Sequence, residues 1–180
     1  MPNWSIPATD LALKIGRLIP GISEEQNERL LELTFQILNI LAQDQLPRVR
    51  QIIAEEIKNA TNAPKDTVRC LARDVELIVA APILEYSPML SDSELLDLIA
   101  AGVAEGGLSA ISRRRRVSDN VAKAIVAAND IPTLATLLGN PNAQVREDAL
   151  DQIIEKAERA DSLHDPLAPR PELSMGAIRR

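Results

Sequence analysis

The residue types that most often carry out catalysis or bind metals are scarce in this chain. It contains one histidine, His164, and one cysteine, Cys70. Together they cannot supply a zinc site of the usual nitrogen and sulfur kind, and His164 lies in a proline-interrupted segment that gives an acid–base pair no rigid support. Cys70 lies in an apolar helical pattern, so we interpret it as a core thiol. The sequence therefore predicts no enzyme activity, no cofactor and no metal.

Carboxylates are abundant, but their positions favour structural roles. Glu55 and Glu56 stand close to Lys58, a pattern typical of a solvated helix face. Asp92 and Asp119 each follow a serine at the start of an apolar run, which predicts helix caps. Nothing in the spacing makes these carboxylates converge on a metal or a substrate.

Four consecutive arginines form the strongest candidate interaction patch in an otherwise acidic chain. They are Arg113, Arg114, Arg115 and Arg116. One interpretation is structural, because cations near a helix C-terminus complement its dipole and pair with neighbouring carboxylates. The other is a contact surface for anions, which Arg69 and Arg146 would complete if they faced the same groove. Guanidinium groups bind carboxylates and phosphates in a bidentate manner, so acidic protein segments and nucleic acids both stay open as targets.

The composition limits the classes of fold and partner. Apolar residues make up 46% of the 180 residues, yet Phe, Trp and Tyr occur once each, so the core must consist of Leu, Ile, Val and Ala. That mixture favours packed helices over a β-sandwich or barrel. The net charge of -6 argues against a protein that coats nucleic acid or an anionic membrane through its overall field.

The compartment can also be inferred from the sequence. A single cysteine allows no intramolecular disulfide, which fits a reducing environment. The N-terminus lacks the pattern of a secretory signal, and no apolar run reaches the ~18 residues of a membrane span. We therefore expect a cytoplasmic protein with no membrane contact.

Hydrophobic periodicity places several helices in the first half of the chain. We expect helices over residues 9–19 and 23–43, and a third that begins at Pro47 and ends near Asn59. Proline suits the first turn of a helix because its missing N–H has no partner there in any case.

The helix that begins near Pro64 is expected to be longer. Its apolar stripe includes Val75 and Ile78 on the inner face, with a kink or restart at Pro82, where the ring would clash with the preceding turn. Ser87-Pro88 closes this region.

The second half contains an internal repeat of 27 residues. Leu90-Ser91-Asp92 matches Val117-Ser118-Asp119, and the apolar positions that follow stay in register. In each copy the Ser-Asp pair can cap a first helix, Gly102 or Asn129 marks its end, and a short second helix follows. Each unit is a helix hairpin with one apolar face, which it can bury only against a neighbour.

The repeat defines the expected organisation of the chain. A third, weaker copy begins at Asn140-Pro141 and is expected to form one helix to about Ala160. We expect N-terminal helices packed on the stack over residues 1–87, helix-hairpin repeats over 88–160, and a flexible proline-containing tail over 161–180. Residues 1–160 are expected to form one continuous domain.

Three segments resemble the second helix of a HEAT repeat. Each has a proline a few residues before a Val-Arg pair. The prolines are Pro47, Pro64 and Pro141, and the pairs are Val49-Arg50, Val68-Arg69 and Val145-Arg146. The stretch from Val79 to Val145 also resembles a bacterial family of HEAT-like proteins with no assigned function. These resemblances imply an all-α solenoid of antiparallel helix hairpins and bring no catalytic residue. The 27-residue unit is shorter than the roughly 40 residues usual for HEAT repeats.

Three functional hypotheses follow. The first is a non-catalytic protein-interaction scaffold whose partner presents an acidic or helical segment. The alternative is a protein that binds the phosphate backbone of nucleic acid through Arg113–Arg116. A base-modifying enzyme is disfavoured because the aromatic residues needed for stacking, Trp4, Phe35 and Tyr86, lie outside the repeats. The third hypothesis is a homo-oligomer formed through uncapped ends of the stack.

Overall fold

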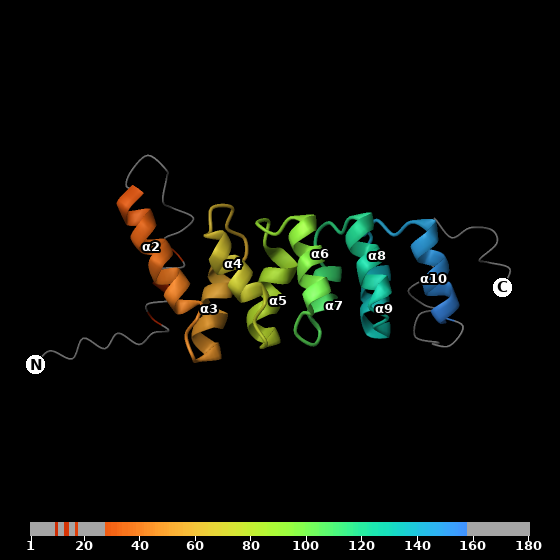
Figure 1. Ribbon diagram of the computed structural model, residues 1–180, viewed down its shortest axis with the longest axis horizontal. Coiled ribbons are helices and arrows are strands. Elements are labelled where there is room, and N and C mark those ends of the chain that lie inside the picture. Colours follow the sequence, from red (N-terminus) through yellow and green to blue (C-terminus); the bar gives the residue numbers. More distant parts are fainter. Residues whose placement is uncertain (1–9, 11–12, 15–16, 18–27, 158–180) are drawn as a thin grey trace, which may run out of the picture. The chain divides into compact units, whose positions relative to one another are not determined.

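The protein is all-helical throughout the part that the structure describes. Figure 1 shows a computed structural model, which describes residues 10, 13–14, 17 and 28–157. These residues contain nine α-helices and no strand, and their only β-type pairing is an isolated parallel bridge between Val117 and Ala143. The helix expected over residues 9–19 and the expected tail fall largely or wholly outside them. No described helix is both long and apolar enough to cross a bilayer.

The chain divides into two compact units, Met1–Ser91 and Asp92–Arg180. The helices described in the first unit are α2 (Glu28–Leu41), α3 (Pro47–Ile57), α4 (Lys65–Ala72) and α5 (Leu77–Tyr86). Helix α5 packs on α3 and α4, and α2 contacts both of these helices. Their fully buried side chains include Leu38, Ile53, Ile57, Leu71, Ile83 and Leu84. The aliphatic core expected from the composition is thus confirmed in this unit.

Two helix starts in the first unit follow from proline. Pro47 is the first residue of α3, and Pro64 occupies the N-cap position of α4 with an extended backbone. Both positions agree with the sequence prediction, because proline costs no hydrogen bond at the first turn.

The prediction of one long helix after Pro64 is wrong, because the helix is interrupted by a turn at Asp74. Helix α4 ends at Ala72 and α5 begins at Leu77, while Pro82 lies inside α5. The Asp74 carboxylate accepts a hydrogen bond from the backbone N–H of Glu76 at 3.0 Å, which gives the backbone an alternative to the helix.

The break also reverses the expected orientation of two apolar side chains. Val75 and Ile78 were expected on the inner face, but they are 84% and 53% exposed. Val75 lies in the turn and Ile78 lies just after it, so the helical periodicity of α4 does not extend to these two residues.

The described residues of the second unit form five helices in two layers. These are α6 (Asp92–Ala101), α7 (Gly107–Ser112), α8 (Asp119–Ala127), α9 (Ile131–Gly139) and α10 (Glu147–Ala157). Helix α8 packs against both α6 and α10, and α7 packs against α9. The fully buried side chains include Ile111, Ile125, Leu134, Leu137 and Leu150.

The repeat seen in the sequence has a counterpart in backbone geometry. Helices α6 and α8 begin 27 residues apart, at Asp92 and Asp119. After each helix one residue adopts the left-handed conformation, Gly102 at φ +87° and Asn129 at φ +59°. Glycine and asparagine are the residues that tolerate this conformation, so both helix ends agree with the prediction.

The helix expected to start at Asn140-Pro141 begins later, at Glu147. Residues 140–146 form a loop instead, in which the Asn140 side chain accepts a hydrogen bond from the N–H of Asn142 at 2.9 Å. This side-chain turn at Asn140 is not continued into a helix, and α10 starts only beyond Val145.

Candidate interaction site

The four consecutive arginines form an ordered loop between two helices of the second unit. We call residues Arg113–Arg116 the arginine loop. Arg113 is the C-cap of α7, and its N–H is within 3.2 Å of the carbonyl oxygens of Ser109 and Ala110. The expectation that the run follows the end of a helix is therefore confirmed.

Asn140 fixes the backbone of the arginine loop. Its side-chain amide donates hydrogen bonds to the carbonyl oxygens of Ser112 at 2.7 Å and Arg114 at 2.8 Å. Just after the loop, Val117 pairs with Ala143 and accepts a hydrogen bond from the N–H of Gln144 at 2.9 Å. The backbone of the loop is thus held along the 140–144 segment, so its conformational entropy is already reduced before any ligand binds.

The four arginine side chains differ in exposure. Burial lowers the pKa of Arg114, and the nearby Asp92 carboxylate partly opposes that shift. Arg113, Arg115 and Arg116 are exposed. Because Arg114 is half-buried beside a carboxylate, the other three present most of the loop's charge to solvent.

Arg146 belongs to a network at the starts of α8 and α10. Its Nε lies 3.4 Å from Oδ2 of Asp119, while Nζ of Lys123 lies 3.1 Å from the same oxygen and 3.0 Å from Oδ2 of Asp148. Asp119 therefore pairs with two cations, and Oδ1 is buried without a hydrogen-bond partner among the described residues. The cap itself comes from Ser118, which accepts from the N–H of Val121 at 3.5 Å.

Arg69 is placed in a different part of the protein from the other candidates. It is an exposed residue of α4 in the first unit, whereas the arginine loop and Arg146 belong to the second. Arg69 therefore cannot complete the patch within a single unit, and a groove shared by these arginines stays a prediction.

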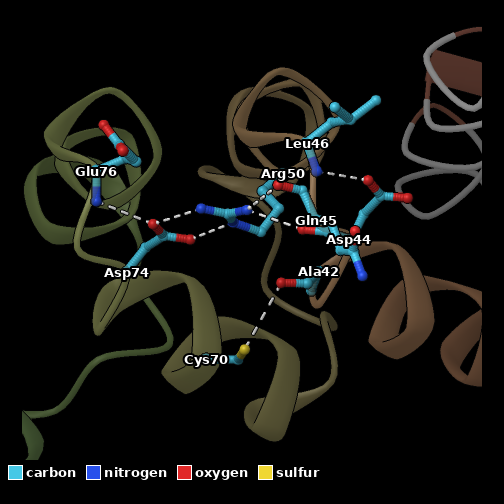
Figure 2. Close-up of polar contacts among 8 residues, drawn as sticks. All are labelled: Ala42, Asp44, Gln45, Leu46, Arg50, Cys70, Asp74 and Glu76. Carbon is cyan, nitrogen blue, oxygen red and sulfur yellow. Dashed lines mark hydrogen bonds and ion pairs between the residues drawn. The ribbon is translucent and has the colours of Figure 1, made fainter.

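A second polar cluster, which the sequence analysis missed, links two hairpin turns of the first unit. Figure 2 shows the Arg50 guanidinium between the Asp74 carboxylate and the backbone of Asp44 and Gln45. Its Nε and Nη2 donate to Asp74 at 2.5 and 3.0 Å, and its Nη1 donates to the carbonyl oxygen of Asp44 at 2.8 Å. A signal was present in the sequence, because Asp44 and Asp74 are 30 residues apart and each precedes a helix.

The remaining candidates carry no chemistry that the structure reveals. Burial and the nearby Asp74 raise the pKa of Cys70, although Arg50 opposes the shift, so its thiolate is less populated than usual. No group of three or more His, Cys, Asp or Glu side chains within the described residues could hold a metal ion. His164 and Trp4 lie outside the described residues.

Within the described residues, these features define an all-helical protein with a charged loop as its candidate site. Residues 79–180, more than half of the chain, match the family described as an uncharacterised protein conserved in bacteria (DUF2336). The chain belongs to this family, and the matched region contains the arginine loop. Neither the curated proteins nor the solved structures include a match to this chain.

Proposed function

We propose that this protein is a non-catalytic scaffold that binds another protein, and that an acidic segment of the partner contacts the arginine loop. The observation that carries the proposal is the fixed geometry of this loop. Two hydrogen bonds from Asn140 hold its backbone, and Arg115 and Arg116 are exposed at its end. Holding a cationic loop in place reduces the entropy lost when an anion binds.

We also propose that the helix pairs form a HEAT-like solenoid. Support comes from the second unit, where α6, α8 and α10 follow one another in one layer while α7 packs on α9. Stacking of this kind exposes successive helices and turns along one surface, and solenoid proteins use such surfaces to bind extended or helical segments. A cytoplasmic location fits the single cysteine.

Carboxylates are favoured over nucleic-acid phosphates as the target. The chain from Asp92 to Arg180 contains no Phe, Trp or Tyr on which a base could stack. Binding to a nucleic-acid backbone usually relies on many phosphate contacts, which the net charge of -6 would oppose. A short acidic segment needs only the few guanidinium groups that the loop offers.

Affinity capture from a bacterial extract tests the proposal. The full chain would be compared with an Arg115→Ser/Arg116→Ser variant, and retained proteins would be quantified by mass spectrometry. Two exposed charged contacts of about 0.5–1 kcal/mol each correspond to roughly a 5- to 30-fold loss of affinity. We therefore expect one or a few proteins to be retained by the wild type and strongly depleted with the variant.

Two further variants separate local recognition from net charge. Lys65→Ser removes one exposed cation from the first unit and should retain the partner fully. Arg115→Lys/Arg116→Lys keeps the charge but removes the bidentate forks, so it should retain the partner only in part. Equal recovery with the wild type and the double Ser variant would refute the arginine loop as the interface.

A further inference from the structure

The exposed large apolar side chains of the described residues are concentrated in the first unit. They are Leu33, Ile40, Leu46, Val75, Leu77, Ile78 and Tyr86. Four of them lie in, or directly after, the two hairpin turns that Arg50 connects. We call Leu46, Val75, Leu77 and Ile78 the turn edge. Val75 is 84% exposed and Leu46 is 61% exposed, so nothing in the described part of the chain covers this surface.

The backbone under the turn edge is rigidly held. The N–H of Leu46 donates to the Asp44 carboxylate at 2.8 Å, and the N–H of Glu76 donates to the Asp74 carboxylate at 3.0 Å. Arg50 then joins the two turns, as Figure 2 shows. Because these bonds fix both turns, the apolar side chains cannot easily withdraw from water, and a partner that covers them orders little new backbone.

Charged residues of both signs stand next to these apolar residues in the sequence. Arg48 and Arg73 are exposed cations in or beside the two turns, and Glu76 is an exposed anion between Val75 and Leu77. A partner rich in one charge would meet repulsion from part of this rim. In a two-fold dimer, Arg48 and Arg73 of one copy can lie against Glu76 of the other copy, and the same pairing is repeated on the opposite side of the axis.

We infer that the turn edge is a self-association surface, on which a second copy of this chain packs its own turn edge in an isologous dimer. Val75 and Ile78 lie at the centre and exclude water from the contact, and Arg48, Arg73 and Glu76 fix the register at the rim. The inference is independent of the proposed function, because the arginine loop lies in the other unit.

Sedimentation equilibrium of the full chain tests this inference. The wild type should show a concentration-dependent dimer, whereas Val75→Asp, which places charges at the centre of the contact, should shift the sample to monomer at the same concentration. Val75 is almost fully exposed, so the variant should keep the far-UV circular dichroism spectrum and melting temperature of the wild type. Arg115→Ser/Arg116→Ser serves as the matched control and should dimerise like the wild type.

Charge-reversal variants test the pairing itself. Glu76→Arg makes the rim cationic, and Arg48→Glu/Arg73→Glu makes it anionic, so each variant alone should dimerise at least about tenfold more weakly. An equimolar mixture of the two should recover association, because each cationic rim then meets an anionic one. A wild-type chain that stays monomeric at high concentration, or a mixture that fails to associate when the wild type does, would overturn the inference.

Discussion

Arg50 and Asp74 show how one ion pair joins two hairpin turns. Their side chains are 13% and 8% exposed, and the guanidinium also donates to the backbone carbonyl oxygen of Asp44. Replacing Arg50 by alanine leaves the Asp74 carboxylate half-paired in a partly buried position. We expect Arg50→Ala to lower the free energy of unfolding by about 2 kcal/mol, measured by urea denaturation. A loss below the error of that measurement would show that water replaces the guanidinium.

The same pair predicts a pH dependence of stability. Burial alone would raise the pKa of Asp74, but hydrogen bonds from Arg50 and from the N–H of Glu76 lower it below the ordinary value of 3.8. A carboxyl group with a lowered pKa stabilises the folded state above its unfolded pKa, and that contribution is lost as the pH falls through the folded pKa. Unfolding free energy should therefore decline below about pH 4 and do so less steeply in Asp74→Asn. Parallel pH profiles for the two proteins would contradict this assignment.

Individual residue environments set the limit of what the sequence could predict. Helical periodicity after Pro47 predicts inward positions for Val49, Ile52, Ile53 and Ile57. Val49, Ile53 and Ile57 are fully buried, whereas Ile52 is only partly buried. Val75 and Ile78 fit the same periodicity but are exposed, because the Asp74 turn interrupts the helix. Asp74 also pairs with Arg50, which is 24 residues away, and a local pattern does not reveal that contact.

At the scale of the element, two glycines allow the effect of backbone strain on stability to be measured without a change in packing. Gly102 ends α6 at φ +87°, whereas Gly139 is helical, and an added Cβ would meet nothing within 4 Å at either position. We expect Gly102→Ala to destabilise the protein by about 1 kcal/mol, because alanine rarely adopts positive φ. Gly139→Ala should be neutral or stabilise by about 0.5–1 kcal/mol. Thermal melts of both variants check the comparison, and equal melting temperatures would refute it.

Asn140 links the order of the arginine loop to its proposed role in partner binding. Asn140→Asp keeps the shape of the side chain but removes both N–H donors to Ser112 and Arg114. We expect faster amide hydrogen exchange over residues 112–117 and a stability loss of about 1–3 kcal/mol. Partner capture should also weaken although all four arginines remain. Unchanged exchange in this segment would mean that the Val117–Ala143 pairing alone holds the loop.

The elements of the second unit could be predicted better than their boundaries. The 27-residue spacing and the helix ends at Gly102 and Asn129 were readable, because few residues adopt positive φ. The third copy was placed too early, since Asn140-Pro141 also resembles a helix start. Asn140 instead follows the end of α9 and begins a loop, in which its side chain contacts the preceding repeat.

At the scale of the whole molecule, the aliphatic composition correctly predicted an all-helical protein. The arginine run was also recognised from the sequence, whereas its anchoring by Asn140 and the exposure of the turn edge were not. Both depend on contacts between residues more than 20 positions apart. Such long-range contacts determine which residues form the protein surface. Because one fold can host many functions, function has to be inferred from these surface sites.

Direct binding to matched anions tests the central claim that the arginine loop recognises acidic protein segments. Fluorescence anisotropy would compare a labelled glutamate-rich peptide with a labelled DNA duplex of similar charge, each titrated with the wild type and with Arg115→Ser/Arg116→Ser. We expect tighter binding of the peptide than of the duplex, and a roughly 5- to 30-fold loss of peptide affinity in the variant. Tighter binding of the duplex, with a steep decrease as salt is added, would contradict this claim and favour nucleic acid as the ligand.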